Sequence, residues 1–564
     1  MKRRILAFML ALAMLCPMLL TGCGKETETD DGTKQETTRA TVSLNMFVVT
    51  DSKTTEEAKL AVEEEFNRIT KSSFTTAVDI IFCTPDEYVE VLNNRFLLAE
   101  EAKNNSSAVV TTALDSDVVT EEELVTNENG VSVLKYPEIN EGQIDIVFVQ
   151  DFDHLYSLVK GEGGSKLENL NDHLSNTGRS KILTDVISDP LFAYTKIDNN
   201  TYAIPNNRIV GEYTYLLVNK DIVTGDKNGD GSITSDEING AYYNFSDINT
   251  FFDCKDLIDY IKANKTDMVP VLEDFENPYV YNWMNDSEFS ILGSKAYFGN
   301  QTSKDNDEYV MNNIFSIKEF TEFELLMKKY ETEGYFAQDV ANAKANKNFG
   351  VAVMSGNSSI VDEYGDNYYI KVISNPALTN ENLFTSFFGV SKYTKNKDRA
   401  MEIITMLNTD SELRNVLQYG VEGVHYELDE EDRVERFNND YIMDINTTGN
   451  VFIAYPEEDM ADDIWERGVS SNLDMRIHAL TGLWRDMLAV DTEITANLAA
   501  VSKTYKDRMD ACTTVEELQA FFETAKGEVD ADEAFVKATD TQNEKSPKAI
   551  YVKWYQTGWP SSDV

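Results

Sequence analysis

The segment 226–237 carries oxygen-bearing side chains at the spacing of an EF-hand calcium loop. In such a loop, every second residue from the first to the ninth supplies an oxygen ligand, the fourth of these ligands being a backbone carbonyl, and a closing glutamate supplies both of its carboxylate oxygens. The residues at the ligand positions are Asp226, Asn228, Asp230, Ser232, Thr234 and Glu237. An acidic surface loop is the alternative, since the chain has 98 Asp and Glu residues. That excess explains the carboxylates but not Gly231 at the sharp turn or Ile233, so we predict a structural Ca²⁺ ion here.

Cys23 has the surroundings of a cysteine that carries a lipid. A basic run at 2–4 precedes an apolar stretch over 5–20 and the small residues Thr21 and Gly22. This order is typical of a secretion signal, and small residues directly before a cysteine resemble the lipobox of bacterial lipoproteins. The resemblance implies that residues 1–22 are removed and that Cys23 is acylated. An ordinary signal with a chance cysteine is the alternative.

A lipid on Cys23 would be the only membrane attachment that the sequence predicts. No second apolar run approaches the roughly 20 residues that a membrane-spanning helix needs. Residues 24–39 contain no aliphatic or aromatic side chain, so we predict a disordered tether over 23–40. The expected location is the outer face of the cell membrane, lipid-anchored, as in Gram-positive bacteria.

The histidines and the remaining cysteines follow no catalytic or metal-binding pattern. The four histidines are His154, His173, His425 and His478. They lack metal-ligand spacing, and we interpret each as structural or surface-exposed. Cys83, Cys254 and Cys512 are irregularly spaced, so buried free thiols are favoured over a bridge between Cys254 and Cys512. The sequence contains no hydrolase, phosphate-loop or dithiol motif, although two carboxylates could meet at glycosidase spacing in the fold.

The composition predicts a globular protein with more than one core and a strongly negative surface. The chain has 564 residues, of which 42% are hydrophobic and 11% aromatic, so it can fill two or three cores by the usual relation of length to domain number. Its formal net charge of −48 repels phosphate backbones and anionic headgroups. We therefore do not expect the protein to bind nucleic acid.

The first part of the chain alternates predicted strands and helices. Strands are predicted at 41–49, 78–82 and 144–149. The first helix opens at a capping box over 54–57, and the second is capped by Thr84-Pro85. Their predicted inner faces are Ala58, Val62, Phe66 and Ile69 in the first helix and Val89, Leu92, Phe96 and Ala99 in the second. This alternation predicts a mainly parallel sheet covered by helices.

Later segments continue the mixed α/β pattern. Strands are predicted at 212–220, 349–354 and 370–374, with a tight turn into a helix at 355–359. Residues 387–390 lead into a further helix, with Ala400, Ile403, Ile404 and Leu407 facing inward. Residues 460–535 are predicted to be mostly helical.

Three stretches carry a pattern longer than any single motif. The first joins Tyr202-Ala203-Ile204-Pro205 to Asn219-Lys220-Asp221, the second runs from Gly389 through Gln418-Tyr419-Gly420 to Tyr426, and the third joins Thr448-Gly449-Asn450 to Trp465-Glu466. Together they resemble the family 1 extracellular solute-binding proteins of ABC importers, in particular the LipO-like lipoproteins of Firmicutes. The chain departs from that pattern in a polar insertion at 104–143 and at 480–484.

The resemblance implies a type II periplasmic-binding-protein-like α/β fold. Such a fold has two lobes joined by about three crossings, a hinge, and a ligand enclosed in the interlobe cleft. We assign 41–203 and 376–420 to lobe 1. We assign 204–375 and 421–564 to lobe 2, which includes the calcium loop and the additional C-terminal helices.

The predicted ligand-binding residues follow from this topology, because ligands of open α/β sheets lie outside the carboxyl ends of the strands. From lobe 1 they are Asp51, Gln150, Asp151 and Phe152. From lobe 2 they are Glu212, Tyr213, Tyr281, Trp283, Gly356, Asn357 and Trp484. Aromatic rings suit the C–H face of a sugar, and carboxylates and amides suit its hydroxyls, so an oligosaccharide is the expected ligand.

The expected function is therefore that of a monomeric receptor without catalytic activity, which captures a solute and delivers it to an ABC transporter permease. A peptide-binding receptor of the same fold and a surface-anchored glycan-processing enzyme are the alternatives. A receptor binds without turnover, whereas an enzyme forms product.

Overall fold

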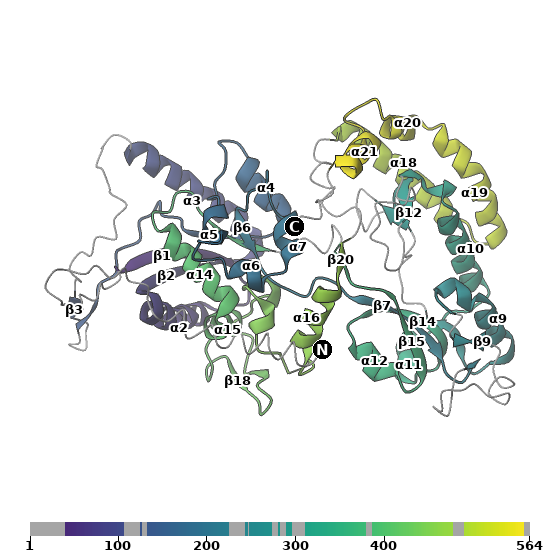
Figure 1. Cartoon of the computed structure of the whole chain (residues 1–564), viewed down its shortest axis with the longest axis horizontal. Helices are drawn as coiled ribbons and strands as arrows, with labels where there is room; N and C mark the ends of the chain where they lie inside the picture. Colours follow the sequence, from purple (N-terminus) through teal and green to yellow (C-terminus); the bar gives the residue numbers. More distant parts are fainter. Residues whose placement is uncertain are drawn as a thin grey trace. The chain divides into compact units, whose positions relative to one another are not determined.

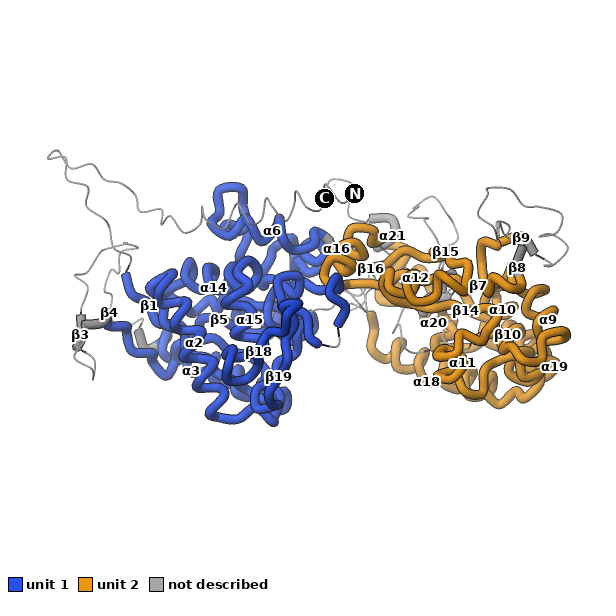
Figure 2. The backbone as a smooth tube through the Cα atoms, turned by 90° about the horizontal axis from the view of Figure 1, so that it is seen from below, with its two compact units in different colours: residues 1–208, 385–464 blue, residues 209–384, 465–564 orange. Residues whose placement is uncertain are grey.

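The computed structural model describes residues 40–106, 124–126, 132–224, 243–245, 248–272, 280–282, 289–295, 311–378, 386–458, 460–477 and 490–557. The chain forms two compact units, shown in different colours in Figure 2. Unit 1 comprises 1–208 and 385–464, and unit 2 comprises 209–384 and 465–564. The chain passes from one unit to the other three times, after residues 208, 384 and 464.

Unit 1 is built on a five-stranded sheet with the strand order β2-β1-β5-β17-β6. The strands are β1 (Val42–Val49), β2 (Thr76–Cys83), β5 (Ile146–Val149), β6 (Ala203–Pro205) and β17 (Phe387–Val390). β1 pairs in parallel with β2 and β5, whereas β17 is antiparallel to β5 and β6. The predicted parallel arrangement of the first three strands is confirmed. Almost all of β1 is buried, as expected for a strand covered on both faces.

The first helix, α2 (Glu56–Phe74), packs on this sheet through the predicted inner face. Ala58, Val62, Phe66 and Ile69 are all buried. The cap lies one residue later than predicted, because the Thr55 hydroxyl accepts the Ala58 N–H at 3.2 Å. The Thr54 hydroxyl instead lies 2.8 Å from that of Thr50.

The second helix, α3 (Pro85–Ser106), differs from the prediction at one position of its inner stripe. Leu92, Phe96 and Ala99 are buried as predicted, but Val89 is 44% exposed. Tyr88 takes the place of Val89 in the buried stripe. The Tyr88 ring is fully buried, and the Tyr88 hydroxyl donates to the Phe148 carbonyl. The prediction failed because Val89 and Tyr88 both fit the helical period, and only the position of β5 favours the tyrosine.

Residues 421–464 lie in unit 1, not in the second lobe to which the sequence analysis assigned them. α14 (Lys397–Thr409) has the predicted buried face, and α15 (Ser411–Tyr419) follows it. A hairpin of β18 (Tyr426–Leu428) and β19 (Val434–Arg436) comes next. The segment after the hairpin is fastened to α15, because Tyr441 donates to the Leu417 carbonyl at 2.7 Å and Gln418 donates to the Met443 carbonyl at 2.8 Å.

Unit 2 contains a four-stranded sheet with the order β10-β14-β7-β15. The strands are β7 (Tyr213–Asn219), β10 (Val269–Leu272), β14 (Phe349–Gly356) and β15 (Tyr368–Ser374). Side chains along β7 alternate between two cores, as the two-residue period of a strand requires. Leu216 and Val218 pack with α9 (Lys255–Asn264), whereas Tyr215 and Leu217 pack toward α12 (Ser359–Tyr364).

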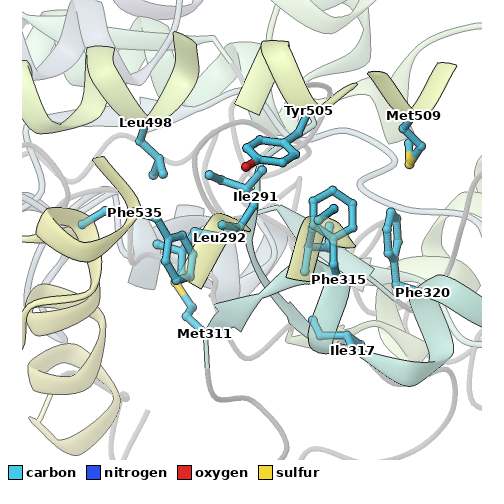
Figure 3. Close-up of a cluster of buried hydrophobic side chains, with 14 of the residues drawn as sticks. Ile291, Leu292, Met311, Phe315, Ile317, Phe320, Leu498, Tyr505, Met509 and Phe535 are labelled. Carbon is cyan, nitrogen blue, oxygen red and sulfur yellow. The ribbon is translucent and has the colours of Figure 1, made fainter. Parts of the chain in front are cut away.

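The C-terminal helices form a second packed region of unit 2, shown in Figure 3. They are α18 (Thr492–Asp510), α19 (Val515–Asp530), α20 (Glu533–Thr539) and α21 (Pro547–Thr557). Phe315 lies at the centre of this core, where its ring contacts Phe320, Tyr505 and Phe522. α10 (Lys318–Thr332) carries Phe320 into the same core. The predicted helical character of this part of the chain is confirmed for the described residues.

Cys83, Cys254 and Cys512 are free thiols, so the alternative of a bridge between Cys254 and Cys512 is wrong. Cys83 and Cys254 are buried and Cys512 is half-buried. Burial raises the pKa of Cys83 to about 11 and that of Cys254 to about 12, which keeps both protonated at neutral pH. Among the described residues, no helix is both long enough and apolar enough to span a membrane.

Candidate functional site

Unit 1 presents the predicted residues at the carboxyl edge of its parallel strands. The Thr50 N–H donates to the Cys83 carbonyl at 2.9 Å, which joins the ends of β1 and β2. Asp51 follows β1 and is exposed, and its carboxylate accepts the Lys53 N–H at 2.8 Å. Gln150 and Asp151 follow β5, which pairs in parallel with β1. The three side chains therefore share one edge of the sheet, as predicted.

Asp151 and Phe152 have structural roles at the start of α4 (Phe152–Lys160). The Asp151 carboxylate caps the helix by accepting the His154 N–H at 2.8 Å. Phe152 is 1% exposed, and the centroid of its ring lies 6.3 Å from that of Tyr156. Capping and packing account for these two residues, and their roles as ligand contacts remain predictions.

A segment that the sequence analysis did not select crosses the same edge of unit 1. The Ile442 carbonyl accepts the Thr50 hydroxyl at 2.9 Å and the Asp51 N–H at 3.2 Å. The Asp440 carbonyl accepts the Thr55 N–H at 2.9 Å. These hydrogen bonds join distant parts of the sequence; Thr50 and Ile442, for example, are 392 residues apart. No local sequence signal could have revealed them.

Unit 2 presents a second set of predicted residues where β7 begins and β14 ends. Tyr213 pairs with Gly356 across the two strands, and Glu212 is exposed beside them. A Cβ on Gly356 would lie 2.7 Å from the Ile360 Cδ1 atom, so a glycine allows α12 to pack closely. The Asn357 side chain accepts the Ser359 N–H at 2.8 Å, which shapes the predicted turn into α12.

The helix α16 (Ile464–Asp474) supplies charged residues to this second set. The Tyr213 hydroxyl donates to the Asp474 carboxylate at 2.6 Å. Arg467 donates to the Ser358 hydroxyl at 2.9 Å and to the Asp362 carboxylate at 2.6 Å. Burial, together with the Asp474 carboxylate, raises the pKa of Tyr213, so this hydroxyl remains a donor at neutral pH.

Asp474 and Arg467 were missed because a charged helical residue is usually solvent-exposed. Their separation of two helical turns is the one signal that places them on the same side of α16. The sequence cannot say which element that side meets, because α16 begins at the third passage between the units.

Several predicted residues lie outside the part of the chain whose side chains are described. Only the backbone of Tyr281 is described, in β11 (Val280–Asn282). The others are Cys23, Asp226, Asn228, Asp230, Ser232, Thr234, Glu237, Trp283 and Trp484. Their lipid, calcium and ligand roles remain predictions.

Comparison with known proteins identifies the fold. No family model matches the chain. A carbohydrate ABC transporter substrate-binding protein of Streptococcus pneumoniae is 30% identical over 167 residues, which cover 27% of this chain and 34% of that relative. The crystal structure of an N-glycan transport solute-binding protein, also from S. pneumoniae, matches with a TM-score of 0.53 and 16% identity. The match covers 92% of this chain and 99% of that protein.

This chain has the fold of the extracellular solute-binding proteins. The identification confirms the predicted α/β fold with two units and the resemblance to extracellular solute-binding proteins. Each unit carries one of the two surfaces described above. The matched region of the curated relative is only about a third of its length.

Proposed function

We propose that this chain is an extracellular receptor that captures a neutral oligosaccharide, without turnover, and delivers it to the permease of an ABC importer. The likeness to an N-glycan transport solute-binding protein over nearly the whole of both chains carries this proposal. The partial match to a carbohydrate ABC transporter substrate-binding protein supports the same class of solute.

The exposed and half-buried side chains of both surfaces suit a neutral saccharide. Asp51 and Gln150 in unit 1, and Glu212 and Asn357 in unit 2, offer carboxylate and amide groups to hydroxyls. The half-buried ring of Tyr213 offers an apolar face beside them. The guanidinium of Arg467 already binds Asp362, and the net charge is −48, so anionic solutes are disfavoured.

The proposal includes two features that rest on the sequence. A lipid on Cys23 holds the receptor at the outer face of the membrane, close to a permease. A Ca²⁺ ion bound by 226–237 stabilises the segment between β7 and α9 and takes no part in chemistry.

A thermal-shift screen of the mature chain against neutral glycans and short peptides tests the function. A ligand that binds only the native state raises the melting temperature as its concentration exceeds Kd. We expect neutral N-glycan oligosaccharides to raise it and to be recovered intact afterwards. Stabilisation by peptides alone would refute the sugar ligand, and recovery of shortened glycans would refute the receptor in favour of a glycan-processing enzyme.

A further inference from the structure

Phe437 is an aromatic residue of unit 1 that remains open to solvent. Its side chain is 50% exposed, whereas the nearby Tyr426 and Tyr441 are 4% and 1% exposed. Single exposed apolar residues are common on protein surfaces, so exposure alone assigns no role. Its role follows from how its backbone is held, where it lies in unit 1 and which side chains are next to it.

The backbone around Phe437 is held firmly. The Phe437 N–H donates to the His425 carbonyl at 2.9 Å, and the His425 ring is buried 5.9 Å from that of Tyr441. The Tyr441 hydroxyl is fixed in turn by the Leu417 carbonyl of α15. The Thr55 N–H, at the start of α2, donates to the Asp440 carbonyl at 2.9 Å. An exposed ring on a fixed support loses little entropy when it binds a ligand.

The segment that carries Phe437 meets the carboxyl edge of the unit 1 sheet, where the sequence predicts ligand contacts. Ile442, five residues after Phe437, accepts hydrogen bonds from Thr50 and Asp51 directly beyond the carboxyl end of β1. Ligands of open α/β sheets bind outside the carboxyl ends of the strands. Figure 1 shows α2, α15 and the β18 hairpin on the same side of unit 1. Phe437 thus lies three residues before Asp440, in the segment whose carbonyls at 440 and 442 accept the Thr55 and Asp51 N–H groups.

The neighbours of Phe437 are exposed groups that can bind hydroxyls. Asn438, Asn439 and Asp440 follow it directly, and all three are exposed. The Asn438 side-chain oxygen accepts the Asp440 N–H at 3.0 Å, which shapes the turn and leaves the amide NH₂ at the surface. An aromatic face next to amides and a carboxylate is suited to a sugar ring, because the C–H face of the sugar is apolar and its rim is polar.

We propose that Phe437 is a stacking platform for one sugar ring of a neutral saccharide, with Asn439 and Asp440 binding its hydroxyls. The carboxylates of Asp51 and Asp440 disfavour an acidic sugar at this position. The assignment rests on the proposed function and adds a specificity-determining residue that the family pattern in the sequence did not indicate.

Calorimetric titration of the mature chain with a neutral N-glycan oligosaccharide tests the platform. Phe437→Ala should weaken binding by about tenfold, the effect of removing a well-placed aromatic contact. Phe437→Trp should retain or improve affinity, because a larger ring keeps the stacking face. Leu97→Ala is the matched control, since Leu97 is 59% exposed in the same unit but lies about 18 Å along α3 from its start at the sheet edge.

The results of these titrations distinguish a failure of the Phe437 platform from a failure of the proposed receptor function. If the unchanged chain binds the glycan and Phe437→Ala binds it equally well, the platform is refuted while the receptor stands. A parallel loss in Leu97→Ala would also refute it, because the effect would not be specific to the site. If the unchanged chain binds no neutral glycan, the proposed function itself fails. A melting temperature of Phe437→Ala equal to that of the unchanged chain shows that the variant is folded.

Discussion

His154 and His425 each use a ring nitrogen to accept a backbone N–H in unit 1. The Nδ1 atom of His425 accepts the Val421 N–H at 2.9 Å, and that of His154 accepts the Gln150 N–H at 3.3 Å. Burial lowers the pKa of both residues, although Asp440 and Asp151 oppose the shift. Both are structural histidines, as the sequence analysis predicted, because only a neutral ring can accept these hydrogen bonds.

The lowered pKa of His425 makes stability depend on pH in a definite direction. The His425 ring binds a proton more readily in the unfolded chain than in the folded chain. Its contribution to stability is therefore present above its pKa in the unfolded chain and is lost as the pH falls through its pKa in the folded chain. We expect the melting temperature to fall between pH 7.5 and 5.5, and to fall less in His425→Asn. Parallel melting curves across this range for the two proteins would contradict the assignment of His425.

The predicted lipid depends on a single thiol, so one substitution should separate secretion from anchoring. Cys23→Ser should yield a chain that is found in the medium, because the serine hydroxyl cannot take the thioether-linked lipid. Cys512→Ser is the control, since Cys512 is a half-buried free thiol of the folded part and should leave the chain in the membrane fraction. A Cys23→Ser chain that still sediments with membranes would show that Cys23 is not the anchor.

At the residue scale, the sequence predicted side chains whose position depends on local periodicity. The inner faces of α2 and α14 are correct because their apolar residues recur at the helical period. Val89 was chosen where Tyr88 is buried, and Asp474 was missed, because their positions depend on distant partners. Phe148 fixes Tyr88 and Tyr213 fixes Asp474, across 60 and 261 residues respectively.

At the element scale, the alternation of strands and helices predicted the parallel core of unit 1. β1 and β5 are buried along almost their whole length, and the connecting helices carry apolar stripes, so few other arrangements of these elements are possible. Residues 421–464 were assigned to the wrong unit because their strands are only three residues long and have no periodicity of their own. The side chains of Gln418 and Tyr441, not any local pattern, hold them to α15.

The calcium loop is an element whose role can be tested through stability. After purification in chelator, added Ca²⁺ should raise the melting temperature, and at a hundredfold excess over Kd the stabilisation is about 2.7 kcal/mol. Glu237→Ala should remove most of this gain by deleting the bidentate ligand. Glu427→Ala is the matched control, because Glu427 is an exposed glutamate of the β18 hairpin. Equal gains in both variants would refute the loop as the site.

At the scale of the whole molecule, each unit has its own sheet and its own cores, and the chain passes three times between them. The sequence predicted this organisation through the family resemblance and not through composition, which set only the number of cores. The fold positions two polar surfaces, each at the end of a sheet, but does not specify a solute. The choice of a neutral sugar rests on the side chains at those ends and on the relatives of the chain.

In the proposed function, the mature chain captures a neutral oligosaccharide without altering it. Isothermal titration calorimetry with a neutral N-glycan oligosaccharide tests it most directly, because binding and turnover give different heat traces. Capture without turnover predicts saturable heats that return to the baseline after each injection and fit one site per chain. Absence of heat with every neutral glycan, combined with saturable heats from short peptides, would contradict the sugar ligand. A sustained heat after injection would reveal turnover and contradict the receptor.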